Sequence, residues 1–197
     1  MREVEVKAVV DDWESLRQRL LHTGATLVFS GRLEDRRYDD ADRSLHARDE
    51  LLRVRVLRRS DGAHAELAWK GPTGYENGYK VREEIATAAD DPDALIRIVD
   101  RLGFVLVKQI DRVVEQFELD GATIRLERYP RMDDLVEVEG TPDAIEGVVE
   151  KLGIPRSAFT SERLPAFVKR FERRTGESAA LCDGELAGTV RYSHDDA

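Results

Sequence analysis

Residues 3–9 read Glu-Val-Glu-Val-Lys-Ala-Val, so that charged and apolar side chains alternate from Glu3 to Ala8. The same alternation recurs in Leu52-Arg53-Val54-Arg55-Val56 and in Leu135-Val136-Glu137-Val138-Glu139. Because successive side chains of a β-strand point to opposite faces of the sheet, each stretch predicts a strand with one charged face and one apolar face. The fold therefore depends on where the charged face goes.

Five further segments predict strands, at residues 26–38, 63–70, 79–86, 104–119 and 122–129. Asp61-Gly62 and Asp120-Gly121 are turn sequences typical of β-hairpins, and they indicate that the strands on either side of them pair antiparallel. Residues 36–40 are interpreted as a strand end that enters a turn, with a role in substrate binding as the alternative. The sequence thus predicts about eight strands.

Four amphipathic helices are predicted between these strands. Asp12, Asp91-Pro92 and Thr141-Pro142 are capping sequences for the first three, and Thr160 or Ser161 can cap the fourth. The apolar helix faces need partners, and the strand valines can supply them, which turns the charged strand faces the other way. In an open sheet these charges would face water. In a closed barrel they would line an enclosed space with charge of both signs, which suits a polyanion together with metal ions.

Composition restricts the class of protein. The chain has 197 residues, of which 41% are hydrophobic and 36% charged, and this supports one globular domain with its own core. Because no apolar run approaches the roughly 20 residues that span a bilayer and the first residues lack the apolar region of a signal peptide, we expect a cytoplasmic protein without membrane contact. Residues 1–174 are predicted to form the domain and residues 175–197 a flexible tail.

The ionisable residues restrict the partners and the metal sites that the protein can have. The formal net charge of −9 argues against nucleic acid as a partner, but it leaves room for a local basic cavity. A single cysteine, Cys182, and four scattered histidines make sulfur or imidazole metal sites improbable. Any metal is therefore expected to be bound by oxygen.

The strand residues expected on the same face as the alternating charges form one set, which contains both cations and carboxylates. Their positions share the odd or even spacing of the charged residues along each strand, which we call parity. A glutamate pair two residues apart places both carboxylates on one face, about 6–7 Å apart along the strand, and such oxygens suit Mg²⁺ or Mn²⁺. Lysine and arginine would hold the oxygens of a triphosphate, with arginine able to make bidentate contacts. The set comprises the cations Lys7, Arg53, Arg55, Lys70, Lys80, Arg82, Lys108, Arg112 and Arg125, and the carboxylates Glu3, Glu5, Glu84, Glu127, Glu137 and Glu139.

The motifs that carry this set resemble those of the CYTH domain, found in the triphosphate tunnel metalloenzymes, which include class IV adenylate cyclases, thiamine triphosphatases and inorganic triphosphatases. The resemblance spans roughly residues 1–172 in the order of the family. The matching segments are ExExK at 3–7, LRVR at 52–55, LAWKGP at 67–72, KVREEI at 80–85, VKQIDR at 107–112 and LVEVEG at 135–140.

The resemblance implies an α+β fold in which eight antiparallel strands close into a barrel, the triphosphate tunnel, with the amphipathic helices packed outside. It implies that Mg²⁺ or Mn²⁺ is held by Glu3, Glu5, Glu127, Glu137 and Glu139, with Glu127 at a position where the family usually has an aspartate. A small-molecule triphosphate would be held by Lys7, Arg53, Arg55, Lys70, Arg82, Lys108 and Arg125. Lys80, Glu84 and Arg112 are further candidates, and either a monomer or a homodimer is compatible with the family.

The candidate reactions differ in what attacks phosphorus. Hydrolysis needs a water directed at the terminal phosphate, whereas cyclisation needs a ribose hydroxyl in line with the α-phosphate and an adenine pocket. Class IV cyclases carry a His-Phe dipeptide before ExExK, and this feature is not found here. We therefore expect a triphosphatase acting on inorganic tripolyphosphate, thiamine triphosphate or a nucleoside triphosphate, with class IV adenylate cyclase as the alternative. A polyphosphate- or nucleotide-binding module is the non-enzymatic alternative.

Lys7 is the candidate catalytic residue. A lysine surrounded by other cations is expected to have a depressed pKa, so that its neutral amine could accept a proton from the attacking water.

Overall fold

The computed structural model describes residues 2–76 and 79–193, with side chains from Val4 onward. In this part of the chain the strands are β1 (Arg2–Val9), β2 (Thr26–Asp39), β3 (Leu51–Arg59), β4 (Gly62–Lys70), β5 (Gly74–Glu76), β6 (Tyr79–Ala89), β7 (Val105–Leu119), β8 (Ala122–Arg128) and β9 (Leu135–Glu139). The helices are α1 (Trp13–His22), α2 (Ser44–Ala47), α3 (Pro92–Arg101), α4 (Pro142–Leu152), α5 (Leu164–Thr175) and α6 (Asp183–Leu186), with a 3₁₀ turn at Arg156–Ala158.

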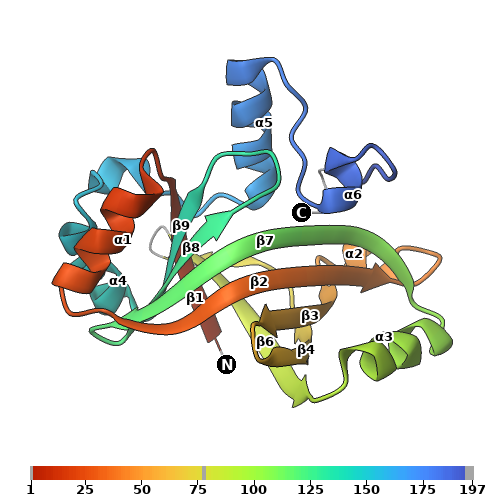
Figure 1. The fold of residues 1–197 in the computed structure, drawn as a ribbon. Coiled ribbons are helices and arrows are strands. Elements are labelled where there is room, and N and C mark those ends of the chain that lie inside the picture. Colours follow the sequence, from red (N-terminus) through yellow and green to blue (C-terminus); the bar gives the residue numbers. More distant parts are fainter. Residues whose placement is uncertain (1, 77–78, 194–197) are drawn as a thin grey trace.

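Eight strands close into an antiparallel barrel. Their order round the barrel is β1, β9, β8, β7, β2, β3, β4 and β6, and β6 pairs back with β1 to complete the ring. β5 is an additional short strand on β6. The long strands β2 and β7 run side by side across the whole molecule, as Figure 1 shows. The predicted α+β fold with a closed eight-stranded barrel is confirmed.

The apolar strand faces point outward and are covered by helices. Val6 and Val138 pack with α1 and α4 in one apolar cluster, and Val54 and Val56 pack with α3 in another. All four valines are almost completely buried. In Figure 1, α1 and α4 lie at one end of the barrel and α3 at the other. Since neighbouring strand residues face opposite ways, the charged positions between these valines point into the barrel.

The helix caps agree with the sequence in three cases out of four. Asp12, Asp91 and Thr141 each accept a hydrogen bond from a backbone N–H of the first turn of the helix that follows. α5 instead begins at Leu164, and Thr160 forms a β-bridge with Lys7, so the predicted cap at Thr160 or Ser161 is wrong. Within the described residues, no helix combines the length and the apolar composition that crossing a bilayer requires.

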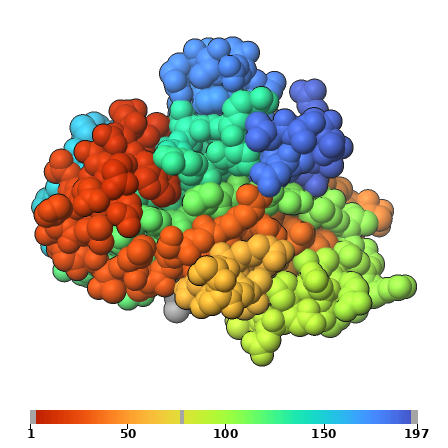
Figure 2. Space-filling model, in the orientation of Figure 1, coloured from red at the N-terminus to blue at the C-terminus, as the bar shows by residue number. Residues whose placement is uncertain are grey.

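Residues 176–193 pack against the barrel, which differs from the predicted flexible tail. Ala180 exchanges two backbone hydrogen bonds with Arg131, and the carbonyl of Leu181 accepts one from Asp111 of β7. Leu181 also joins the apolar cluster beneath α5. Figure 2 shows this segment, in dark blue, seated on the barrel surface. The buried run 179–182 is too short to create a periodic pattern, and the polar residues around it concealed its role.

Candidate functional site

The barrel encloses a cavity of about 690 Å³, a size typical of small-molecule sites. Twenty of the 28 lining residues in the described part of the chain are charged, eleven of them lysine or arginine and nine aspartate or glutamate. The chain as a whole carries a formal charge of −9, so the cavity concentrates cations within an acidic protein. Such a lining favours a compact polyanion, which can be balanced by cations and by metal ions held on the carboxylates.

Most of the sequence-predicted site residues meet in this cavity. The side chain of Glu3 lies outside the described residues, although its backbone pairs with Arg82. The residues that line the cavity as predicted are Glu5, Lys7, Arg53, Arg55, Lys70, Lys80, Arg82, Glu84, Arg112, Arg125, Glu127, Glu137 and Glu139.

Lys108 does not line the cavity, and its placement there is a wrong prediction. A bulge shifts the register of β7 against β2 at this point, so that Arg37 is opposite Lys108 but Tyr38 is opposite Leu106. Val107, the extra residue, faces the cavity. The ammonium of Lys108 is fully buried and donates a hydrogen bond of 2.8 Å to the carbonyl of Ser193 in the C-terminal segment. Strand parity fails across such a bulge because one residue has no partner.

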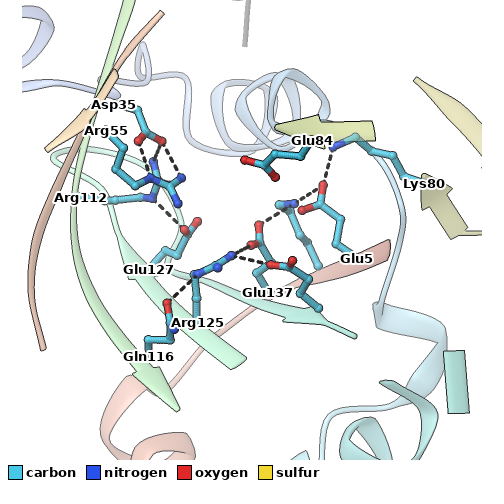
Figure 3. A network of polar contacts seen from close by, with 12 residues as sticks. Glu5, Asp35, Arg55, Lys80, Glu84, Arg112, Gln116, Arg125, Glu127 and Glu137 are labelled. Atoms are coloured by element: carbon cyan, nitrogen blue, oxygen red, sulfur yellow. Dashed lines mark hydrogen bonds and ion pairs between the residues drawn. The ribbon is translucent and has the colours of Figure 1, made fainter. Parts of the chain in front are cut away.

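One group of side chains, on β1, β8 and β9, alternates acid and base. The ammonium of Lys7 lies 2.8 Å from a carboxylate oxygen of Glu5 and 2.7 Å from one of Glu137. Arg125 donates to Glu137 at 2.6 Å and to Glu139 at 3.0 Å. Lys80 donates to Glu5, so that these side chains form one continuous network, of which Figure 3 labels Glu5, Lys80, Arg125 and Glu137.

Direct cross-strand pairing produces this alternation. Lys7 is opposite Glu137 on β9, Arg125 of β8 is opposite the same glutamate, and Glu5 is opposite Lys80 on β6. Opposed strand residues on one face lie within about 5 Å of one another, so opposite charges there attract directly. The register of the barrel therefore sets the contacts of the site.

The network keeps the carboxylates ionised. Burial alone would raise the pKa of Glu5, but Lys7 and Lys80 outweigh both burial and repulsion by Glu137 and lower it to about 2. Burial would also raise the pKa of Glu137, but the nearby cations Lys7 and Arg125 outweigh it and hold this pKa well below the usual value. These carboxylates are thus available as anionic oxygen ligands at any physiological pH.

Lys7 is protonated, contrary to the expected general base. Burial acts to lower its pKa, but the charges of Glu137 and Glu5 raise it above the ordinary value of a lysine. The prediction took the surrounding cations as the nearest neighbours, whereas the closest charges are carboxylates. In this arrangement the amine cannot accept a proton.

A second group lies on β2, β3, β7 and β8. The carboxylate of Asp35 receives Arg55 through Nε at 2.7 Å and Nη2 at 3.0 Å, and it receives Arg112 at 3.0 Å. Arg112 also donates to Glu127 at 2.7 Å, and the hydroxyl of Tyr129 donates to the other oxygen of Glu127 at 2.6 Å. All five side chains line the cavity, and Figure 3 shows Asp35, Arg55, Arg112 and Glu127 beside the first group.

The third group lies between β3, β4 and β6. Arg53 donates to Glu66 at 2.9 Å and to Glu84 at 3.1 Å, and Lys70 lies 3.0 Å from Glu84. The pKa of Glu84 is lowered, because the nearby charges of Lys70 and Arg53 outweigh the effect of burial. Each cation in this group faces the cavity, where phosphate oxygens could replace the carboxylates.

Loops close one part of the cavity. Arg82 donates to the main-chain carbonyls of Gly71 at 2.6 Å and Asp49 at 2.8 Å, so it ties two loops to β6. The carboxylate of Asp49 accepts from the backbone N–H of Thr73 and from Arg163, the residue before α5. α5 is thereby fastened at the cavity, which Arg163 itself lines.

Comparison with known proteins decides the family. The chain matches the CYTH domain family over residues 1–154, which is well over half of its length. It is a member of the CYTH family. A protein of Methanocaldococcus jannaschii named "putative adenylate cyclase" is 25% identical over 166 residues, covering 79% of this chain and 92% of that protein.

Solved structures show the same CYTH architecture. A protein from Pyrococcus horikoshii is 25% identical with a TM-score of 0.68, and the match covers 82% of this chain and 94% of that one. A "putative adenylyl cyclase" from Hippeastrum, described as revealing a dominant triphosphatase activity, has a TM-score of 0.59. It is 18% identical over 91% of this chain and 98% of its own, so the likeness shows the fold alone.

The carboxylates of this CYTH domain are of the chemical type that binds divalent cations. Glu5, Glu137 and Glu139 supply hard anionic oxygens that face the cavity, and an ammonium already bridges the first two. Among the described residues, no three acidic, histidine or cysteine side chains form a ready-made metal site. Lys7, Lys80 and Arg125 already contact these carboxylates, so an ion would compete with them for the oxygens.

Sequence reasoning missed several CYTH cavity residues. Asp35 and Arg37 are spaced by two on β2, and Glu66 shares the parity of Lys70 on β4, so parity could have found all three. The remaining missed residues come from loops, helices and strand ends, where no alternation exists to reveal them. These are Arg43, His46, Asp49, Glu50, Tyr129 and Arg163.

Proposed function

We propose that this CYTH protein hydrolyses a triphosphate inside the barrel with the help of Mg²⁺ or Mn²⁺. The observation that supports the proposal is the barrel cavity, which eleven cations and nine carboxylates line among the described residues. A triphosphate carries about four negative charges, and neutralising them is most of what phosphoryl transfer requires of a protein.

The cations would bind the phosphate oxygens by leaving the carboxylates that hold them in the free protein. Arg53, Arg55 and Lys70 lie on adjacent strands and line the cavity together. Arginine donors fixed by neighbouring groups can meet phosphate oxygens with little reorganisation. Lys7, which is protonated, takes part as a positive charge and not as a base.

The metal would be held by Glu5, Glu137 and Glu139, whose oxygens face the cavity. When bound, such an ion neutralises phosphate oxygens and lowers the pKa of water.

Adenylate cyclase is the second candidate, because the Methanocaldococcus jannaschii relative carries that name. The lining favours hydrolysis of a small inorganic substrate, since twenty of the 28 described lining residues are charged and suit phosphate more than a base. Inorganic tripolyphosphate is therefore the first substrate to test. A cytoplasmic location, and a monomer or homodimer without nucleic-acid or membrane partners, remain part of the proposal.

A panel of tripolyphosphate, thiamine triphosphate and ATP, each with Mg²⁺ or Mn²⁺, tests the proposal. We expect release of orthophosphate, greatest for tripolyphosphate, and its loss when EDTA is added. Cyclic AMP and pyrophosphate from ATP would instead establish the cyclase. Tight binding of all three compounds without any product would show a binding module.

A further inference from the structure

Asp35 is a buried carboxylate that none of the matching motifs includes. It is 2% exposed and lies on β2 directly opposite Arg55 of β3. Its two oxygens accept two hydrogen bonds from Arg55, and one of them also forms an ion pair with Arg112. Burial alone would raise its pKa, but Arg55, Arg112 and Arg53 lower it well below the usual value, so Asp35 is ionised.

The contacts of Asp35 continue across the barrel wall. Arg112 of β7 forms an ion pair with Asp35 through Nη1 and donates Nε to Glu127 of β8, and Tyr129 donates its hydroxyl to the second oxygen of Glu127. We call these five residues, Asp35, Arg55, Arg112, Glu127 and Tyr129, the arginine brace. Figure 3 shows its first four members in line from Asp35 to Glu127.

Contacts within the brace occupy N–H groups of Arg55 and Arg112 that could otherwise donate to a phosphate. Arg112 has two of its nitrogens bound to carboxylates, and both oxygens of Glu127 have donors. Arg55 gives Nε and Nη2 to Asp35, which fixes the plane of its guanidinium and leaves the two N–H groups of Nη1 and the second N–H of Nη2 as donors. Two contacts to one carboxylate hold such a plane far better than one.

We propose that Asp35 is a positioning residue that, through the arginine brace, orients Arg55 toward a bound triphosphate. Arg112 and Glu127 act within the brace, so Glu127 serves to hold Arg112 and not as a metal ligand. The inference rests on the proposed function for its substrate, because it concerns how the same cavity holds phosphate. It adds a role for a residue that neither the motifs nor the comparisons assign.

The direction in which Asp35→Asn changes the affinity for tripolyphosphate shows whether Asp35 positions Arg55 or only repels the anion. Asp35→Asn keeps the shape of the side chain but removes one negative charge from a cavity that binds an anion. If Asp35 only repelled phosphate, the variant would bind tripolyphosphate more tightly. If Asp35 positions Arg55, binding weakens about tenfold or more, the loss expected for one misplaced charge-assisted hydrogen bond.

Isothermal titration of metal-free protein with inorganic tripolyphosphate in EDTA measures this change in affinity. Asp111→Asn is the matched control, because Asp111 is equally buried and paired with an arginine, Arg32, but does not line the cavity. We expect wild-type affinity for this control. Equal or tighter binding by Asp35→Asn overturns the proposal.

A second readout needs no substrate. Arginine Nε–H groups held by carboxylates give protected signals in nitrogen-15 NMR, and we expect the signal of Arg55 to be lost in Asp35→Asn and kept in Asp111→Asn. An unchanged Arg55 signal contradicts the brace. Failure of the wild type to bind tripolyphosphate both in EDTA and with Mg²⁺ added would reject the proposed function, while this signal would still decide whether Asp35 fixes Arg55.

Tyr129→Phe covers the case in which Asp35→Asn does not fold. This variant removes only the hydroxyl that donates to Glu127 at the far end of the brace. We expect a few-fold weaker affinity for tripolyphosphate at an almost unchanged melting temperature. Wild-type affinity in this variant would count against transmission through Glu127 and Arg112.

Discussion

The ammonium of Lys7 lies between two buried carboxylates, those of Glu5 and Glu137. Two carboxylates this close raise each other's pKa unless a cation separates them. Lys7 supplies that cation in the free protein, and both glutamates stay ionised as a result. The cations and carboxylates of the cavity therefore pair with one another in the free protein, and a divalent ion must compete with Lys7, Lys80 and Arg125 for these oxygens.

Glu137→Gln tests which carboxylates hold the ion. We expect affinity for Mn²⁺, followed by the electron spin resonance of the free ion, to fall by about tenfold or more, because an amide oxygen is a weaker ligand than a carboxylate. Glu127→Gln is the matched variant, since its carboxylate is committed to Arg112 and Tyr129. It should keep wild-type Mn²⁺ affinity, and a comparable loss in both variants would return Glu127 to the metal site.

Arg53→Ala tests the phosphate side of the cavity. Arg53 is paired with Glu66 and Glu84, and a chain of three phosphates must contact more of these cations than one phosphate does. We expect affinity for tripolyphosphate to fall about tenfold or more, with a much smaller change for orthophosphate. Arg58→Ala on the outer face of β3 is the control, and it should bind both anions normally. Equal losses for both anions would argue against the proposed cage.

Parity along the strands predicted most of the cavity lining, because alternation fixes which side chains share a face. It could not predict which charges touch, since contacts depend on the register between strands far apart in sequence. Lys7 shows the consequence: its nearest neighbours are carboxylates, which raises its pKa instead of lowering it. Asp35 was missed although its spacing from Arg37 is regular, because neither lies in a segment of strict alternation.

At the scale of elements, β2 and β7 limit what alternation can predict. Both strands are long, and their pairing shifts register between Leu27 and Phe29 and again between Arg37 and Tyr38. A bulge adds one residue to one strand, so that parity reverses beyond it. The sequence identifies these strands correctly but carries no signal for the bulge, and Lys108 was misplaced for that reason.

The C-terminal segment provides the sharpest test of an element. Leu181 is fully buried in the cluster beneath α5, whereas Leu186 in the same segment is 46% exposed. We expect Leu181→Ala to lower the free energy of unfolding by about 2–5 kcal/mol, the usual cost of a buried leucine. Leu186→Ala should cost much less. Urea denaturation measures both, and equal small effects would mean that the segment is the loose tail that its composition suggests.

At the scale of the molecule, the barrel separates two kinds of surface. The valines lie under helices on the outside, and the charges lie within, which is the alternative that the sequence left open between a barrel and an open sheet. Closure brings together residues that are far apart in the sequence, such as Glu5 and Lys80. The sequence favoured this arrangement only through the matching motifs, because alternation alone is equally compatible with charges that face water.

The buried carboxylates also make the stability of the whole molecule depend on pH. Burial alone would raise the pKa of Asp35, but its arginine neighbours lower it well below the ordinary value. The unfolded chain takes up a proton at this residue near pH 3.9, whereas the folded protein does not until a lower pH. The stability that Asp35 contributes is therefore complete above the unfolded pKa and is lost as the pH falls toward the folded one.

We accordingly expect the free energy of unfolding of the metal-free protein to decrease as the pH is lowered from 5 to 3. Glu5 and Glu137 act in the same direction, so the decrease should persist in Asp35→Asn with a smaller slope. One titrating group changes the slope by up to about 1.4 kcal/mol per pH unit. Urea unfolding of both proteins at a series of pH values measures the difference. Parallel curves would show that Asp35 takes up its proton equally in the folded and unfolded states, which the contacts with Arg55 and Arg112 do not permit.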